Sequence, residues 1–373
     1  MRRLYSHHLD DWPRFRWDSA RLSGLLASVR HRQGLLAGHM KALGFDARQE
    51  AALRTLTADV LKSSEIEGEK LDAKQVRSSL ARRMGIEIGG LKAADRNVEG
   101  VVEMMLDATR EYHKPLSAER LRGWQAALFP DGRSGLHKIR AGKWRDDKNG
   151  PMQVISGPVG KGRVHFEAVP AARIPKEMTT FLDWFNRKAD IDEVLHAALA
   201  HLWFVTIHPF DDGNGRVARA VADMDLARSE KSEQRFYSMS TQIRQERDDY
   251  YEALEAAQKG SMDVTAWMEW FLGCLGRAID GASVTLSEVL TKARFWESVR
   301  GTTLNERQTR VLNLVLDGFE GKLTTSKYAR LAKCSTDTAL RDIQALVERG
   351  ILTCGPEKGR STSYALKARD ETK

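Results

Sequence analysis

Cysteine is scarce in this chain of 373 residues, which contains only Cys274, Cys334 and Cys354. Three widely spaced thiols cannot build a disulfide framework, and their spacing does not match that of a structural zinc site. Proteins that use neither device are typical of reducing compartments. We therefore expect a cytoplasmic protein.

Long apolar runs and prolines are also few. The residues from Met1 to His8 lack the apolar centre of a secretion signal, and no apolar run approaches the length needed to cross a membrane. Proline, which interrupts helices, occurs only 9 times, and helix-forming residues dominate. We expect no membrane contact and a mainly α fold.

The helical patterns divide the chain into three predicted parts. Residues 1–92 are expected to form an N-terminal helical domain, residues 93–283 a catalytic core, and residues 284–373 a separate C-terminal domain. The formal net charge of +8 leaves nucleic acid or an acidic protein surface open as partners. Because both signs of charge mix along the helices, most of this charge is expected on solvated faces.

The most informative stretch runs from His208 to Arg219. An asparagine between two glycines, as in Gly213–Gly215, allows the backbone N–H groups to turn toward one point. The residues that follow are predicted to be helical, so this turn would lie at a helix N-terminus, where backbone donors attract phosphate. Arg216 and Arg219 are three residues apart, about one turn, and both can reach phosphate oxygens.

Two further residues complete the chemistry of this stretch. Asp212 is placed to hold a Mg²⁺ ion that bridges phosphates. His208 has an ordinary pKa near neutrality and can take a proton from a hydroxyl. Each residue alone is more often structural, but their order within twelve residues is not explained by chance. Phe210, an aromatic residue in a polar loop, is expected to anchor the loop in the core.

The stretch resembles the signature of the Fic family, His-x-Phe-x-Asp/Glu-Gly-Asn-Gly-Arg-x-x-Arg, at every specified position. Fic proteins are mostly adenylyltransferases, which transfer AMP from ATP to protein hydroxyls. The resemblance implies ATP as substrate and Mg²⁺ as cofactor. It implies that His208 is the general base and that Asp212 binds the metal. The residues implied to bind the nucleotide are Gly213, Asn214, Gly215, Arg216 and Arg219. It also implies a helical Fic core with a small β-hairpin flap.

A second segment, from Ser63 to Gly68, fits the family's inhibitory pattern Ser/Thr-x-x-x-Glu-Gly/Asn. Ser63 and Glu67 lie four residues apart, on one face of a helix. In the family this glutamate pairs with the second arginine of the signature, here Arg219, so that ATP binds unproductively. The resemblance therefore implies an inhibitory helix that precedes the core, and the segment around Trp12–Asp18 resembles an N-terminal domain of bacterial Fic proteins.

Two short β-prone runs, Met152–Ile155 and Arg163–Phe166, surround a turn rich in glycine and predict a hairpin. In Fic proteins such a hairpin is a flap that adds a strand from the target. A plain surface hairpin fits the sequence equally well. The residues implied for target docking are Met152, Gln153, Val154 and His165.

The stretch around Tyr250–Tyr251 resembles the family's nucleotide-side helix. Tyr251 is favoured for packing near adenine, although aromatic residues at helical spacing more often belong to a core.

The spacing of apolar residues in the C-terminal part is typical of a winged helix-turn-helix. Residues 337–346 would form its recognition helix and residues 355–366 its wing. The predicted recognition helix offers one cation, Arg341, opposed by Asp337 and Asp342. Because phosphate neutralisation drives most DNA affinity, protein contact is favoured over DNA contact for this domain.

The sequence and its resemblance to the Fic family thus predict an autoinhibited protein adenylyltransferase that modifies a hydroxyl of a protein substrate and of itself. The resemblance leaves a homodimer open as its assembly. Fic-like proteins can use other phosphate-containing ligands, although the complete signature favours ATP. Two further alternatives stay open. Glu67 could support removal of AMP from modified proteins, or the chain could be a DNA-binding regulator with a nucleotide-sensing core.

Overall fold

The computed structural model describes residues 5–41, 43–87, 92–148, 150–156, 162–187, 190–316, 321–355 and 362–367. These form two compact units, Met1–Ser283 and Val284–Lys373, with the boundary inside one helix. The finer division at residue 92 stays a prediction. Across the described ranges, no helix is both long and apolar enough to cross a membrane.

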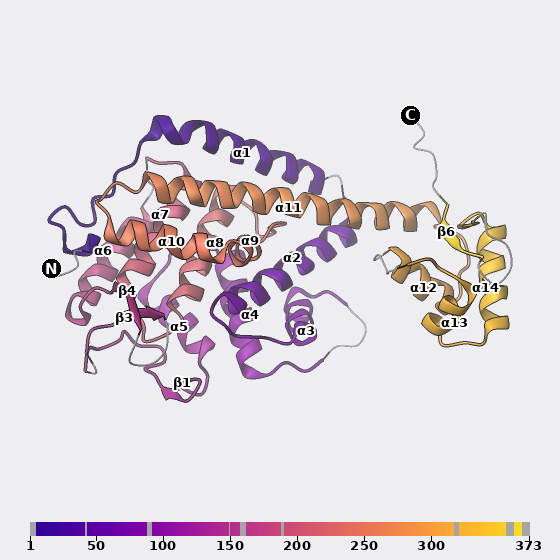
Figure 1. The fold of residues 1–373 in the computed structure, drawn as a ribbon, viewed down its shortest axis with the longest axis horizontal. Helices are drawn as coiled ribbons and strands as arrows, with labels where there is room; N and C mark the ends of the chain where they lie inside the picture. Colours follow the sequence, from indigo (N-terminus) through magenta and orange to yellow (C-terminus); the bar gives the residue numbers. More distant parts are fainter. Residues whose placement is uncertain are drawn as a thin grey trace. The chain divides into compact units, whose positions relative to one another are not determined.

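Helices dominate both units (Figure 1), which confirms the mainly α fold. The helices of the first unit are α1 (Ser19–Lys41), α2 (Phe45–Ile66), α3 (Ala73–Met84), α4 (Arg96–Arg110), α5 (Ala118–Leu128), α6 (Ile174–Asn186), α7 (Glu193–Ile207), α8 (Asn214–Glu230), α9 (Met239–Gln245), α10 (Arg247–Lys259) and α11 (Thr265–Ser298). Two antiparallel hairpins join them, β1 (Arg133–Ser134) with β2 (His137–Lys138) and β3 (Gln153–Ser156) with β4 (Arg163–Glu167).

The core of the first unit is built around α7 and α8, which pack side by side (Figure 1). Every residue of α7 from Val194 to Ile207 is buried, because this helix is apolar on all sides. Its neighbour α8 buries charged residues as well, among them Arg219 and Asp223. Since α2 packs against both α8 and α9, the predicted inhibitory segment lies against the helix that follows the signature loop.

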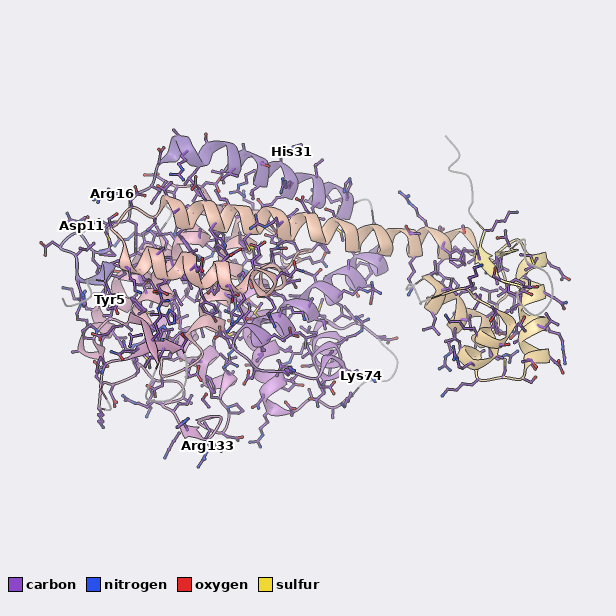
Figure 2. The ribbon with its side chains drawn as sticks, in the orientation of Figure 1. Tyr5, Asp11, Arg16, His31, Lys74 and Arg133 are labelled. Atoms are coloured by element: carbon purple, nitrogen blue, oxygen red, sulfur yellow. The ribbon has the colours of Figure 1, made fainter. Side chains whose placement is uncertain are left out.

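The N-terminal segment reaches distant parts of the first unit. Helix α1 lies along the first turns of α11, held by the ion pairs Arg21–Glu269 and Arg32–Asp280 (Figure 1). Before α1, the buried ring of Tyr5 packs edge-on against Phe166 of β4, with 5.2 Å between ring centroids. Figure 2 labels Tyr5 at the end of the first unit where the described chain begins. The first described residues therefore support the hairpin β3–β4.

The second unit contains α12 (Glu306–Leu316), α13 (Thr325–Ala332) and α14 (Thr336–Glu348), followed by the antiparallel pair β5 (Leu352–Cys354) and β6 (Tyr364–Leu366). Side-chain oxygens of Thr324 and Ser335 cap α13 and α14. The order of elements agrees with a winged helix-turn-helix, which stays a prediction. Residues 356–361 of the expected wing lie outside the described residues.

One charge in the second unit was misjudged from the sequence. Asp342 does not oppose Arg341 on the surface: it is 6% exposed, and its carboxylate binds the guanidinium of Arg307 (2.8 Å) and the side-chain amide of Asn305 (2.9 Å). Packing of α14 against α13 buries this carboxylate, and the paired cation from α12 offsets its desolvation. Asp342 therefore holds helices together.

Candidate active site

His208 ends α7 and opens the loop that leads to α8. Its backbone is left-handed (φ 54°, ψ 59°), a conformation that costs a non-glycine residue about 1–2 kcal/mol. Its N–H donates to Phe204 (3.0 Å), and its ring Nδ1 lies 3.2 Å from the carbonyl oxygen of Val205. Because that carbonyl can only accept, Nδ1 carries the proton and Nε2 is left with a free lone pair.

The imidazole of His208 is neutral at physiological pH. Burial, with a smaller contribution from the positive charge of Arg145, lowers its pKa to about 4. The hydrogen bond to Val205 and the charges of Glu67 and Asp212 oppose this shift. A neutral imidazole with a free Nε2 is the form that can accept a proton from an incoming hydroxyl.

Arg145, which the sequence did not single out, fixes the backbone of His208. It is 3% exposed, and its guanidinium donates to the carbonyl oxygens of His208 (2.8 Å) and Val169 and to the carboxylate of Asp147 (2.7 Å). Its own N–H donates to Pro209 (3.0 Å). A single arginine thus joins three segments of chain behind the candidate base.

The loop between α7 and α8 closes on itself through Asn214. The Asn214 side chain accepts from the N–H of Phe210 (2.9 Å) and donates to the Phe210 carbonyl (2.7 Å). Phe210 is fully buried, which confirms its expected role as the loop's anchor. Gly213 adopts φ 84°, and a Cβ there would lie 2.9 Å from the ring of Phe129. Glycine is therefore required at this position for both reasons.

The N-terminus of α8 faces this loop. The helix begins at Asn214, and its first intrahelical N–H bond runs from Val217 to the carbonyl of Gly213 (3.0 Å). The N–H groups before Val217 consequently have no partner inside the helix, and the helix dipole adds positive potential. This end of α8 can hold an anionic group such as a phosphate.

Asp212 lies at the base of the β1–β2 hairpin. Its carboxylate accepts hydrogen bonds from the hydroxyl of Ser134 and from the N–H of Gly213 (2.5 Å). The neighbouring Asp211 accepts from the N–H of Arg140 (2.8 Å), just after the same hairpin. Figure 2 shows Arg133 of β1 at the outer edge of the unit. The hairpin orients two consecutive carboxylates beside the candidate base.

The two signature arginines are held by the segment at the end of α2. Arg219, 2% exposed, donates to the hydroxyl (2.9 Å) and carbonyl (2.8 Å) of Ser63 and pairs with the carboxylate of Glu67 at 2.9 Å. Arg216 pairs with Glu69. Gly215 leaves the space for this arrangement, because a Cβ there would come within 3.0 Å of the carboxyl carbon of Glu67. The predicted partners Ser63, Glu67 and Arg219 are therefore in contact.

The paired tyrosines of α10 have different surroundings. Tyr250 is buried and hydrogen-bonds to His201 (2.8 Å). Tyr251 is partly exposed and lies under the guanidinium of Arg247, 4.9 Å from the ring centroid. Burial raises the pKa of Tyr251, and the charge of Glu67 raises it further. Tyr251 is thus the more accessible of the two near the inhibitory segment.

The predicted flap is the β3–β4 hairpin, although its turn, residues 157–161, lies outside the described residues. Met152 and Val154 pack on the cluster around Phe166, and Gln153 bonds to Glu167 (3.0 Å). His165 does not lie free for a target: its ring bonds to Glu255 of α10 (2.6 Å) and to Ser156 (2.5 Å). The most exposed apolar residue described on this hairpin is Ile155, at 55%.

The candidate site therefore combines residues from three parts of the chain. The structure brings together the loop 208–213, the first turns of α8 and the end of α2. Sequence reasoning missed Arg145, Ser134 and Glu69. For Glu69 the available signal was its position two residues after the inhibitory glutamate; the other two make contacts that no local pattern shows.

Comparison with known proteins adds independent evidence. Residues 115–226 match the Fic/DOC family, and residues 5–86 match a domain of unknown function, DUF4172. A protein adenylyltransferase Fic of Nematostella vectensis is 38% identical over 119 residues, 30% of this chain and 26% of that protein. A probable protein adenylyltransferase of Aquifex aeolicus is 30% identical over 120 residues, 32% of this chain and 33% of that protein. The matches thus span about a quarter to a third of these relatives.

Solved structures show the same fold. A Fic family protein from Desulfovibrio desulfuricans matches with a TM-score of 0.55 at 21% identity, over 94% of this chain and 97% of that chain. A Fic domain-containing signaling protein from Bacteroides thetaiotaomicron matches with a TM-score of 0.50 at 20% identity, over 70% of this chain and 97% of that one. The signature loop lies inside the matched residues, so residues 115–226 of this chain form a Fic/DOC domain.

Proposed function

We propose that this protein transfers AMP from ATP to a hydroxyl group of a target protein, and that its own α2 segment inhibits the reaction. The observation that carries the proposal is the arrangement around α8. A neutral imidazole with a free Nε2, an open helix N-terminus and two buried arginines meet within twelve residues. The names of the relatives, protein adenylyltransferases, support the same activity.

In the proposed reaction the target hydroxyl oxygen attacks the α-phosphorus of ATP. The bond from the α-phosphorus to the bridging oxygen of the β-phosphate breaks, and pyrophosphate leaves with that electron pair. The hydroxyl proton passes to Nε2 of His208. The N–H groups at the start of α8 and the guanidinium groups of Arg216 and Arg219 would stabilise the phosphate charge, so that positioning and electrostatics supply most of the catalysis.

The residues present fit a Mg²⁺ ion. Mg²⁺ at nucleotide sites takes one or two carboxylates and draws its other ligands from phosphates and water. Asp212 supplies such a carboxylate, already oriented by Ser134 and Gly213. The described residues contain no group of three His, Cys, Asp or Glu that could hold a metal alone. Mg²⁺ held by Asp212 would neutralise charge on the phosphates.

The test is labelling by ATP that carries a tagged adenosine. Glu67→Gly protein should label itself and added proteins, because Arg219 loses its internal partner. His208→Ala in the same background should reduce labelling by about 10²-fold or more, the contribution expected of a general base. His113→Ala, at an exposed histidine whose side chain is 62% accessible, is the matched control. Unchanged labelling after loss of His208 would refute the proposal.

Removal of AMP from modified proteins is a second candidate. Its support is the position of Glu67, whose charge acts on both His208 and Arg219. A carboxylate there could orient a water molecule toward a phosphorus atom. Incubating wild-type protein with a pre-modified target and measuring released AMP distinguishes the two reactions, since Glu67→Gly would abolish removal and enhance transfer.

The C-terminal unit is proposed to contact a protein. On α14, Leu340 is 39% exposed beside the exposed Arg341, and an apolar side chain in that position favours a protein surface over phosphates. Salt-dependent binding to duplex DNA that disappears on deletion of residues 300–373 would instead support a DNA-binding role. A homodimer and a cytoplasmic location belong to the same proposal; light scattering tests the first and cell fractionation the second.

A further inference from the structure

Two carboxylates, on either side of Gly68, contact the two signature arginines. Glu67 pairs with Arg219, and Glu69 pairs with Arg216. The inhibitory pattern in the sequence ends at Gly68 and therefore contains only the first of these contacts. The second joins residues 147 positions apart in the chain and was not expected from any local pattern.

Gly68 makes the double contact possible. Helix α2 ends at Ile66, with Glu67 as its cap, and Gly68 then adopts φ 83°. The N–H of Gly68 donates to Glu65 (3.1 Å), and the N–H of Glu69 donates back to Ser64 (3.0 Å). This left-handed turn, which glycine adopts at no steric cost, folds Glu69 back over the end of the helix. Both carboxylates consequently reach the N-terminal part of α8.

The electrostatics of Arg216 require an anion. Its side chain is 4% exposed, and its guanidinium lies over the ring of Phe129, 4.9 Å from the ring centroid. Among the described residues, its buried Nε has no hydrogen-bond partner, and Glu69 is its one carboxylate partner. A buried guanidinium without a counter-charge is strongly unfavourable. Glu69 meets this need while 43% of its own side chain stays exposed, so it can leave when another anion arrives.

We propose that Glu69 is a second inhibitory carboxylate, so that Glu67 and Glu69 together occupy the two arginines that would otherwise bind phosphates. The inference rests on the proposed function, because it takes Arg216 and Arg219 as the phosphate-binding pair. It extends the inhibition from one arginine to both. A nucleotide must therefore displace two carboxylates, each replaced by one phosphate group.

This arrangement has a consequence for nucleotide selectivity. While both arginines are paired internally, the additional phosphates of ADP and ATP add little binding affinity, so these nucleotides bind only slightly more tightly than AMP. Removing one carboxylate frees one arginine, and the phosphate that binds it then adds a charge-assisted hydrogen bond. Such a bond corresponds to about a tenfold gain in affinity or more. Removing both carboxylates should make the two gains multiply.

The experiment is calorimetric titration of the full chain with AMP, ADP and ATP at fixed Mg²⁺ and ionic strength. The titration compares four proteins: wild type, Glu67→Gln, Glu69→Gln and the double variant. Glu65→Gln is the matched control: its carboxylate lies in the same segment but pairs with Lys62 (2.8 Å) and Arg244 (3.8 Å). Melting temperatures check folding, and Glu69→Ala provides a second substitution that retains no hydrogen-bonding group.

We expect ATP to bind wild type and Glu65→Gln less than tenfold more tightly than AMP. Each single variant should widen this ratio about tenfold, and the double variant about a hundredfold. Ratios for Glu69→Gln and Glu69→Ala within twofold of wild type, together with ratios for the double variants within twofold of Glu67→Gln alone, would overturn the inference.

Nucleotide binding and AMP transfer are measured separately, so the two proposals can fail independently. If the ratios widen as expected but no variant labels any protein, the inference about Glu69 stands and the proposed transfer reaction fails. If Glu67→Gly labels proteins while substitution of Glu69 changes no ratio, the transfer reaction stands and Glu69 has no inhibitory role.

Discussion

Two buried arginines of the first unit, Arg219 and Arg235, contact residues of α2 that lie about one turn apart. Their ion pairs differ in how exposed the carboxylate partner is. Arg219 pairs with Glu67, whose side chain is 31% exposed. Arg235, in the segment after α8, pairs with Asp223 at 2.7 Å and lies 3.9 Å from Asp59, and both of these carboxylates are almost fully buried. The first arginine can exchange its partner for a ligand from solution, whereas the second cannot.

The two ion pairs differ in how far solvent reaches their carboxylates. Along α2, Asp59, Ser63 and Glu67 follow one another at intervals of four residues and share a face. Asp59 also accepts hydrogen bonds from Ser238 and from the N–H of Ser240 (3.2 Å), which ties α2 to the start of α9. The deep end of this face is therefore fixed, and only its end at Glu67 reaches solvent.

The largest expected effect comes from breaking the fixed end. Arg235→Met leaves Asp59 and Asp223 buried without a cation, so the free energy of unfolding should fall by about 3–5 kcal/mol. Urea denaturation followed by tryptophan fluorescence measures this loss. Arg21→Met removes an exposed ion pair with Glu269 and should cost less than about 1 kcal/mol. Equal losses in the two variants would show that the buried pair is not structural.

A smaller effect is expected where α8 approaches Glu67 most closely. Gly215→Ala places a Cβ against the Glu67 carboxylate and should destabilise the protein by about 1–3 kcal/mol, because the carboxylate must move away from Arg219. Combined with Glu67→Gly, the same substitution should cost nearly nothing, because the obstructing side chain is gone. The coupling in this double-mutant cycle, from urea denaturation of all four proteins, is the measured quantity. Additive losses would contradict the observed proximity.

The buried pair should also make stability depend on pH. Burial and the neighbouring Asp59 raise the pKa of Asp223 to about 7, while Arg235 opposes the shift. Between about pH 4 and pH 7 the folded protein then binds a proton at this site that the unfolded chain has released. Stability must fall as pH rises through this window, by up to about 1.4 kcal/mol per pH unit.

Asp223→Asn removes this titration and should flatten the pH dependence of the urea midpoint between pH 4.5 and pH 7. Asp280→Asn, at an exposed carboxylate whose side chain is 58% accessible, serves as control and should retain the wild-type slope. A wild-type slope in Asp223→Asn would mean that Asp223 is ionised throughout this range.

The smallest change in stability is expected at Glu67 itself. Glu67→Gln should lower the free energy of unfolding by about 1–2 kcal/mol. Arg219 loses its counter-charge, but Ser63 retains two hydrogen bonds to it, the amide oxygen can still accept one, and solvent reaches the Glu67 side of the pair. Thermal denaturation without nucleotide measures this difference. A loss above about 3 kcal/mol would place Glu67 with the structural ion pairs instead.

The parts of the site that the sequence predicts share one property: they are local. The pattern of the loop from His208 to Arg219 is complete within twelve residues and includes glycines in a turn. The pattern of the Ser63–Glu67 pair is its spacing along one helix face. The predominance of helix was likewise predictable, because helix-forming residues dominate and prolines are few. The placement of α2 against α8 came from family resemblance and not from periodicity.

The parts that could not be predicted depend on contacts between distant segments. Arg145 holds the carbonyl of His208 from 63 residues away, and Arg235 joins α2 to α8. An arginine that will be buried in an ion pair has no sequence pattern that distinguishes it from one on a solvated face. For the same reason the sequence counted Asp342 as a charge opposing Arg341, since its partner Arg307 lies 35 residues away.

The order of α2 and α8 in the chain also governs how the protein is made. Ser63 precedes Arg219 by 156 residues, so a ribosome that adds about 5–20 residues each second completes the inhibitory helix roughly 8–30 seconds before the arginine that it covers. Helices form on far shorter timescales. Under the proposed inhibition, the nucleotide site would therefore be synthesised after the segment that inhibits it, and a newly made molecule would pass through no interval in which it could modify other proteins without inhibition.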